Sequence, residues 1–429
     1  MQSATTSIET ALDAITNHKP IAQKSPEWLV ARKNLIAASE AGYLLGIRSC
    51  SGMINYIKAK CNLSTSLDNL CKLDSIRHGN VYEDVSRAIY QSRHSLEVKE
   101  YGLITTSKHS LLGASPDGIV IQKKHIMGND KIAESRIGRL VEIKNPYDYD
   151  PSDFIKPEYE IQVLQQQFVL DLHKCDFVKT NIIGSTVNEK TATKGLSPYL
   201  DIDAFLADVI YANPNANPIA NRNIPVSNLT SKGMEKGIII HYKDSETGLY
   251  ITHLYPLETP YTKPGILEWI KTTKATISSS TGICKYKIAV EYWYLAEYFE
   301  KTLEYDAHLF ENIYLPRLEL VWQLIMRIRQ LQELYSSNVI IDFIDNQIKP
   351  HINKPSSFYK DATNQTDICN LLETALQLDV RTNTNNTNNT NAANLNDPVG
   401  KNTCKRNVKQ NAKSNSRTPK SKLVIEYDF

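Results

Sequence analysis

Short apolar runs typical of β-strands interrupt two helical stretches between residues 96 and 144. Apolar residues follow a helical spacing before this segment, at 52–91, and again after it, at 158–173. The strand signals lie at residues 96–98, 119–121 and 140–144. Helix, strands and helix thus follow one another along the chain. The order predicts an α/β fold with a mixed central sheet flanked by helices.

Composition agrees with a folded globular chain. Of the 429 residues, 41% are hydrophobic and 22% are charged, which excludes a collagen-like fibre, a coiled-coil rod and a mostly disordered chain. No apolar run approaches the roughly 20 residues that span a bilayer, and the first thirty residues lack a secretory h-region. Seven scattered cysteines without a CxxC pair indicate reduced thiols that pack as small apolar side chains. We therefore expect an intracellular protein without a membrane partner.

The net charge of +2 is unevenly distributed. Residues 401–429 contain eight Lys or Arg and two acidic residues, so the preceding 400 residues are slightly acidic. A body of this kind that binds nucleic acid must use local basic patches and bound metal. The basic tail itself resembles a nuclear import signal.

Two short motifs can form one chemical site. Ser115-Pro116-Asp117-Gly118 is a tight turn before a strand, so the carboxylate of Asp117 projects from the sheet. Glu142 and Lys144 are two apart on another strand and share one face. Two carboxylates with a backbone carbonyl form an all-oxygen site suited to Mg²⁺ or Mn²⁺. A lysine beside that site can orient water and neutralise a scissile phosphate. Each motif alone is better explained by an ordinary turn or a solvent-facing strand edge.

Five ordered sequence blocks resemble the lambda-exonuclease-like family (YqaJ-type viral recombinases, or alkaline nucleases) of the PD-(D/E)XK nucleases. The match covers about residues 25–180 in the family's order and spacing. A weaker similarity at 290–294 and 315–322 is typical of the versions in large DNA viruses of eukaryotes. The blocks are Pro26–Leu29 with Arg32 and Ser39, Gly79 with Glu83, Leu112–Gly118, Val141–Pro146, and Tyr159–Gln166 followed by Cys175–Val178.

The resemblance implies a restriction-endonuclease-like α/β core with helical N-terminal and C-terminal additions. Its exonuclease domain covers residues 25–345. Within that domain the expected parts are a catalytic core at 75–183, an insertion at about 184–235 and a helical C-terminal part at 286–345. Outside it, composition indicates a polar leader at 1–24, a peripheral segment at 346–378, and a disordered Asn/Thr-rich and basic tail at 379–429.

The resemblance also implies a role for each matched residue. Asp117, Glu142 and the carbonyl of Ile143 would hold the metal, with Lys144 serving the attacking water. Glu83 and Gln162 would act in the same catalytic site, although each is otherwise read as an ordinary polar helix residue. The family's 5′-phosphate and DNA contacts fall on Arg32, Ser39 and Ser115.

Two further expectations concern residues beside these. Trp28 is expected to be a core anchor rather than a residue that stacks on bases. The segment 122–139 between the two motifs carries Lys123, Lys124, Lys131, Arg136 and Arg139. A solvated loop is slightly favoured for it over a hairpin that contacts DNA.

The activity implied by the family is a Mg²⁺-dependent 5′→3′ exodeoxyribonuclease on double-stranded DNA ends, for which Mn²⁺ can substitute. Its use would be viral DNA recombination, repair or genome maturation. The implied partners are duplex DNA with free ends and a single-strand annealing or binding protein, and a homo-oligomer is compatible. Location in the host nucleus is favoured over the cytoplasm by the basic tail. The alternatives are an endonuclease on the same core and a catalytically inactive DNA-binding or host-regulating module.

Overall fold

The structure of the chain is a computed structural model. It describes residues 2–17, 20–23, 25–63, 74–106, 109–123, 135–185, 199, 201–208, 224–244, 250–281 and 288–380. The tail that was expected to be disordered lies almost entirely outside these residues, and so does most of the insertion at 184–235. Within the described part of the chain, no helix is both long and apolar enough to cross a membrane.

A seven-stranded mixed sheet forms the centre of the molecule, with the strand order β2-β5-β6-β7-β10-β8-β9. Helix α5 precedes its first strand and α7 connects β6 to β7, which run parallel. The expected α/β class, with a mixed central sheet flanked by helices, is therefore confirmed. The elements of this core are α5 (Asp74–His94), β2 (Leu96–Lys99), β5 (Gly118–Lys123), β6 (Leu140–Lys144), α7 (Pro157–Leu170) and β7 (Lys174–Gly184).

The N-terminal part of the chain packs beside α7 around a second, three-stranded sheet of order β1-β4-β3. Strand β1 pairs in parallel with β4, which leads directly into the turn that contains Asp117. Helix α3 ends before Gly46, whose φ of +72° lies in the left-handed region that glycine tolerates. The elements are α1 (Gln2–Asn17), α2 (Pro26–Lys33), β1 (Ile36–Ala37), α3 (Ala38–Leu44), α4 (Cys50–Lys60), β3 (Ile104–Thr105) and β4 (Leu112–Ala114).

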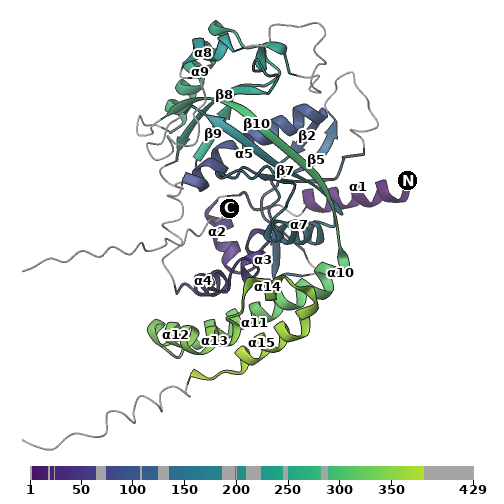
Figure 1. The fold of residues 1–429 in the computed structure, drawn as a ribbon, viewed down its shortest axis with the longest axis vertical. Helices are drawn as coiled ribbons and strands as arrows, with labels where there is room; N and C mark the ends of the chain where they lie inside the picture. Colours follow the sequence, from purple (N-terminus) through teal and green to yellow (C-terminus); the bar gives the residue numbers. More distant parts are fainter. Residues whose placement is uncertain are drawn as a thin grey trace, which may run out of the picture.

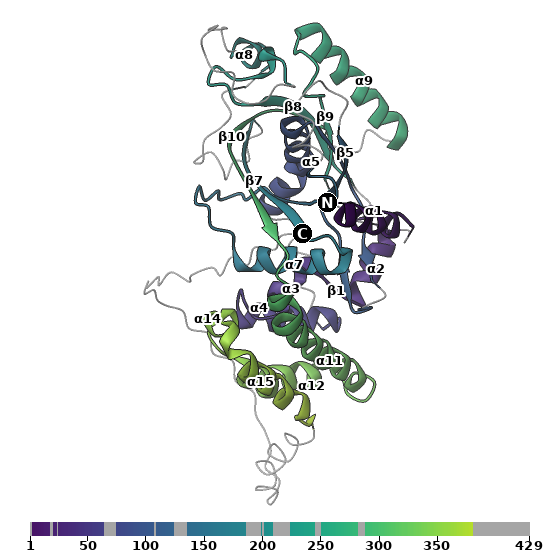
Figure 2. The same ribbon diagram turned by 90° about the vertical axis from the view of Figure 1, so that its right-hand side faces the viewer.

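The expectation of a helical C-terminal part at 286–345 is wrong for its first third. Residues Ala289–Glu304 form β10, which pairs antiparallel with both β7 and β8. Buried Glu291, Trp293 and Leu295 alternate with half-buried residues on the other face, which is the period of a strand. Figure 2 shows β7 and β10 as a long curved pair through the molecule.

Strands β8 (Lys236–Lys243) and β9 (Tyr250–Leu254) pair antiparallel at the edge of the large sheet. Apolar side chains of α9 (Lys263–Thr281) pack with those of β8 and β10, so α9 covers this end of the sheet (Figure 2). The short helix α8 (Ile202–Ala207) packs in the same cluster through Phe205.

The C-terminal helices pack at the opposite end of the molecule (Figure 1). They include α11, which has Pro316 in its first turn. Residues such as Ile352, Tyr359 and Leu372 are buried in the same apolar cluster as α3, α4 and α7. Residues 346–378 are thus part of the packed core and not a peripheral segment. These helices are α10 (Ala307–Leu309), α11 (Leu315–Leu331), α12 (Ser337–Phe343), α13 (Lys349–Ile352), α14 (Ser356–Lys360) and α15 (Gln365–Gln377).

Candidate active site

Asp117 and Glu142 lie on neighbouring strands at the point where β5 begins. Gly118 pairs with Val141, so Asp117 stands immediately outside the ladder, opposite the last residues of β6. Its Oδ2 accepts a hydrogen bond of 2.7 Å from the backbone N–H of Ile143. Because the N–H and C=O of one strand residue point to the same side, the carbonyl of Ile143 faces Asp117 too. The turn therefore brings a carboxylate and a carbonyl together.

Glu142 points from β6 towards α7 and is fully buried. Its Oε1 accepts a hydrogen bond of 2.5 Å from Gln162, and its Oε2 accepts one of 2.8 Å from Gln166. Since two glutamines one helical turn apart each hold one oxygen, the carboxylate is fixed in orientation. Gln162 therefore lies in the site as expected, and Gln166 shares its contact with Glu142.

Lys144 lies on the same face of β6 as Glu142. Its Nζ is 2.8 Å from Oε1 of Glu142 and 4.9 Å from the centroid of the Tyr159 ring. Only 10% of its side chain is exposed, so the ammonium group is held at the site and not in solvent. Asp117, Glu142 and Lys144 are thus brought together by one turn and one strand.

The oxygen atoms at this site are of the kind that bind a divalent cation. Burial, with the nearby carboxylates of Glu142 and Glu83, raises the pKa of Asp117 well above its usual range. Among the residues that the structure describes, no three His, Cys, Asp or Glu side chains meet at metal-binding spacing. Two carboxylates and one carbonyl remain, which suit Mg²⁺ when water completes its shell. The residues fit such an ion, and a cation would relieve the repulsion between the carboxylates.

Glu83 reaches this region from α5. It lines a cleft of about 590 Å³ together with Asn80 and Asp84, Tyr250 and Thr252 of β9, and residues of the 20–23 and 99–102 segments. Its charge acts on Asp117 across the site. From this position the carboxylate of Glu83 can bind water or a metal ion from the side of the cleft.

The three expected phosphate contacts form one cluster on α2, α3 and the catalytic turn. Nη2 of Arg32 donates to Oγ of Ser39 at 3.1 Å, and its guanidinium lies 4.4 Å from the ring centroid of Trp28. Nε1 of Trp28 in turn donates to Oγ of Ser115 at 3.3 Å. Trp28 is buried in an apolar cluster, as expected of a core anchor. Arg32 and Ser115 are therefore joined through the indole ring.

Comparison with known proteins agrees with this arrangement. Residues 27–173, which contain every site residue predicted from the sequence, match the YqaJ-like viral recombinase domain. This segment is similar to that family of domains. The sequence resemblance is thereby confirmed.

A protein of Acanthamoeba polyphaga mimivirus, named only as uncharacterized, is 27% identical over 338 residues. The match covers 75% of this chain and 55% of the relative, so the chain spans about half of that relative's length. It agrees with the expected relation to large DNA viruses.

Two solved structures of an alkaline exonuclease (LHK-Exo) from Laribacter hongkongensis are also similar, one of them in complex with dAMP. They are 26% and 25% identical, and each match covers 37% of this chain and 74% of that protein, with a TM-score of 0.28.

The YqaJ-like domain contains a buried ion pair that the sequence did not single out. Glu40 lies 3.2 Å from Nη2 of Arg32 and 2.7 Å from Nζ of Lys60. Although burial opposes ionisation, the charges of Lys60 and Arg32 hold the pKa of Glu40 below its usual range. Lys60 also donates to the carbonyls of Arg32 and Leu35. The signal available in the sequence was the position of Glu40 in the first turn of α3, where its Oε2 accepts from the N–H of Ala37.

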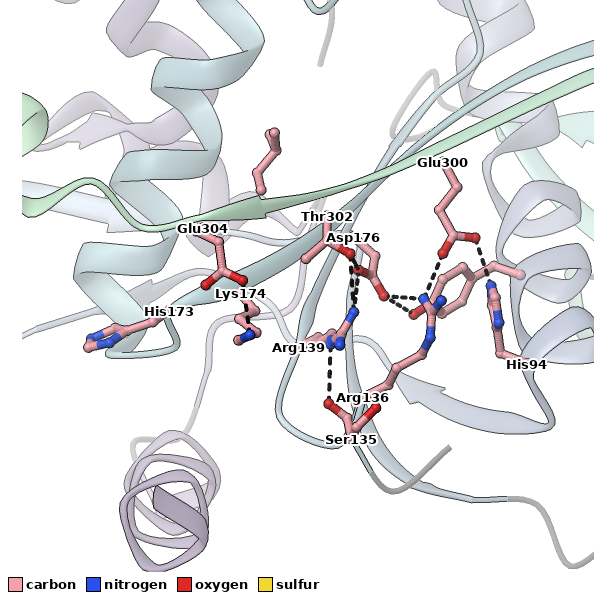
Figure 3. Close-up of polar contacts among 12 residues, drawn as sticks. His94, Ser135, Arg136, Arg139, His173, Lys174, Asp176, Glu300, Thr302 and Glu304 are labelled. Atoms are coloured by element: carbon pink, nitrogen blue, oxygen red, sulfur yellow. Dashed lines mark hydrogen bonds and ion pairs between the residues drawn. The ribbon is translucent and has the colours of Figure 1, made fainter. Parts of the chain in front are cut away.

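Two arginines of the 122–139 segment are neither solvated nor placed to contact DNA. Arg136 lies 2.6 Å from both Asp176 of β7 and Glu300 of β10, and Arg139 lies 3.0 Å from Asp176 (Figure 3). Tyr90 of α5 donates to Asp176 as well. These ion pairs fasten the end of the segment to the central sheet, so both expectations fail for these two residues. Lys124 and Lys131 lie outside the described residues.

Proposed function

We propose that this chain is a metal-dependent deoxyribonuclease that degrades double-stranded DNA from its 5′ ends and leaves a 3′ single strand. The observation that carries this proposal is the convergence of Asp117, the Ile143 carbonyl, Glu142 and Lys144 at the junction of β5 and β6. The YqaJ-like domain supports a nuclease acting on DNA as the general class.

In this proposal Asp117, Glu142 and the Ile143 carbonyl hold Mg²⁺, for which Mn²⁺ can substitute. The ion, when bound, supplies Lewis-acid polarisation of a phosphoryl oxygen. Gln162 and Gln166 keep the Glu142 carboxylate aimed at one position. Lys144 orients the attacking water and stabilises charge that develops on the phosphate. Glu83 holds a water molecule from the side of the cleft.

The preference for 5′ ends rests on the Arg32, Ser39 and Ser115 cluster. A guanidinium group with two hydroxyls is suited to a terminal phosphate, because arginine donates in a planar fork. Ser115 is two residues from Asp117 in sequence, so a phosphate held there lies near the metal ligands. Such an anchor favours removal of nucleotides from a 5′ end over cleavage within a strand.

The alternatives differ in what they require of this site. An endonuclease on the same core would cut DNA without ends. A catalytically inactive DNA-binding or host-regulating module is disfavoured by the complete Asp117, Glu142 and Lys144 set. The uses that we propose are recombination, repair or maturation of viral DNA, with a single-strand annealing or binding protein as partner. The basic tail makes the host nucleus the proposed location.

Metal dependence provides the test. Purified protein with linear duplex DNA should release acid-soluble nucleotides in Mg²⁺ and none in EDTA. Ca²⁺ should support DNA binding and little cleavage, because its larger radius and looser coordination position water poorly. Equal hydrolysis in EDTA would contradict the proposal.

A further inference from the structure

Helix α7 carries a third buried glutamine, which bonds away from the metal ligands. Nε2 of Gln165 donates to the carbonyl of Ile36 at 2.8 Å and to the carbonyl of Gly113 at 3.1 Å. The two carbonyls belong to β1 and β4, the parallel pair of the small sheet. The Gln165 side chain is fully buried. One amide therefore holds two strands at the same time.

Each of these strands leads into the proposed phosphate site. Ile36 is three residues before Ser39, and Gly113 is two residues before Ser115. Meanwhile Gln162 and Gln166, on either side of Gln165 in the same helix, hold the Glu142 carboxylate. A single rigid helix thus contacts both halves of the active site through hydrogen bonds.

Burial of the Gln165 amide leaves its oxygen atom without a hydrogen bond from the part of the chain that the structure describes. Oε1 of Gln165 is buried and has no hydrogen-bond partner among the described residues. A buried polar atom without a partner destabilises a fold, so its presence calls for an explanation. The two donated bonds provide it, since removing the amide would leave two buried carbonyls with one acceptor site unpaired each.

We infer that Gln165 is a positioning residue that sets the distance between the 5′-phosphate anchor and the metal ligands. The inference rests on the proposed function and adds a determinant of substrate specificity to it. Loss of the two bonds frees β1 and β4 to move relative to α7, which displaces Ser39 and Ser115 while Glu142 stays on Gln162 and Gln166. The terminal phosphate and the scissile bond then no longer fit their sites together.

The same helix offers a matched control. Gln167 is also fully buried, and its Nε2 donates to two backbone carbonyls, those of His173 and Leu303, at 3.0 Å each. Its Oε1 likewise lacks a partner among the described residues. The carbonyl of His173 immediately precedes β7, and that of Leu303 lies at the end of β10. Neither strand carries one of the proposed phosphate contacts. Gln165→Met and Gln167→Met therefore remove equivalent bonds with different expected consequences.

The experiment compares linear duplexes with 5′-phosphate and 5′-hydroxyl ends, in Mg²⁺ for hydrolysis and in Ca²⁺ for binding by fluorescence anisotropy. Wild type should prefer phosphorylated ends, and Gln165→Met should reduce the kcat/KM ratio of the two substrates by roughly tenfold to a hundredfold. The binding ratio in Ca²⁺ should fall in the same direction. Gln167→Met should lower stability to a similar extent and leave both ratios unchanged.

Several outcomes would overturn the inference. One is an equal change of the ratios in the two variants, and another is no change in Gln165→Met. A wild-type protein without preference for phosphorylated ends would overturn it as well. If Gln165→Met does not fold, Gln165→Asn, whose shorter amide cannot reach both carbonyls, carries the same expectation. Absence of any hydrolysis by wild type would instead refute the proposed function, while the binding ratio would still test the role of Gln165.

Discussion

The indole N–H of Trp28 donates a hydrogen bond of 3.3 Å to the hydroxyl of Ser115, two residues before Asp117, the proposed metal ligand. Trp28 also lies under the guanidinium group of Arg32. Helix α2 is thereby attached to the turn that contains Asp117 through a side chain with two contacts. A change in this ring should alter the phosphate site without touching the metal ligands.

A specific role of Arg32 in binding the terminal phosphate can be distinguished from a general loss of folding by changing the substrate together with the protein. Arg32→Ala should reduce kcat/KM on 5′-phosphorylated duplex by roughly 10- to 150-fold, because a charge-assisted contact is worth about 1.5–3 kcal/mol. On 5′-hydroxyl ends the loss should be small, because no dianion is present. Initial rates on both substrates form a double-mutant cycle in which folding defects cancel.

Equal losses on the two kinds of end would mean that Arg32 acts only through its ion pair with Glu40. Arg32→Lys keeps the charge and loses the planar fork, so it should recover part of the preference at most. Full recovery by lysine would contradict bidentate recognition of the phosphate.

The metal ligands and Lys144 should be indispensable. Asp117→Ala, Glu142→Gln and Lys144→Ala should each lower the hydrolysis rate by about a hundredfold or more, because each removes a group that acts at the reacting phosphate. The two carboxylate variants should also weaken Mg²⁺ binding measured by isothermal titration calorimetry.

Lys174→Ala is the control for Lys144→Ala, since Lys174 is half exposed and pairs with exposed Glu304 (Figure 3). It should retain wild-type activity. Retention of more than a few per cent of activity by any of the three site variants would contradict the assignment of that residue.

The ion-pair network on β7 and β10 should contribute acid-sensitive stability. Burial opposes ionisation of Glu300, but its bond with His94, the hydroxyl of Tyr298 and the charge of Arg136 lower its pKa to about 2. A carboxylate with a lowered pKa stabilises the fold above its unfolded pKa, and the effect disappears as pH falls towards 2. Glu300→Gln should therefore cost up to roughly 3 kcal/mol near neutral pH. The difference from wild type should shrink between about pH 4.5 and 2 in urea unfolding.

Glu304→Gln on the same strand is the matched control. Its ion pair with Lys174 is exposed, so the change should cost less than about 1 kcal/mol at any pH. A pH-independent cost of Glu300→Gln would show that the carboxylate contributes by shape and hydrogen bonding alone.

The basic tail should contribute to DNA affinity through counterion release. Deletion of residues 401–429 should weaken binding mainly at low salt. The slope of log K against log salt should become less negative by up to about seven, because the tail carries eight cations. Binding titrations at several salt concentrations measure this. An unchanged slope would exclude a role of the tail in DNA binding.

Local motifs made much of the site predictable. The Pro-Asp-Gly turn fixes Asp117 at the start of β5, and the period of two puts Glu142 and Lys144 on one face of β6. Both positions depend only on neighbouring residues. The helical spacing of Gln162 and Gln166 likewise brings both onto Glu142.

Contacts between distant segments were less predictable. Ala289–Glu304 was assigned to helix, yet β7 lies more than a hundred residues earlier and β8 about fifty, and pairing with both stabilises the segment as a strand. Gln165 reads as an ordinary helix residue, because its partners Ile36 and Gly113 come close only in the folded chain. The ion pairs of Arg136 depend in the same way on two strands that no local pattern joins.

The central claim is that this chain degrades linear duplex DNA from its 5′ ends. The most direct measurement incubates it with Mg²⁺ and a linear duplex labelled at either the 5′ or the 3′ end, beside a covalently closed circle. The account predicts early release of the 5′ label as a mononucleotide, late release of the 3′ label and an intact circle. Cleavage of the circle, or release of the 3′ label first, would contradict it.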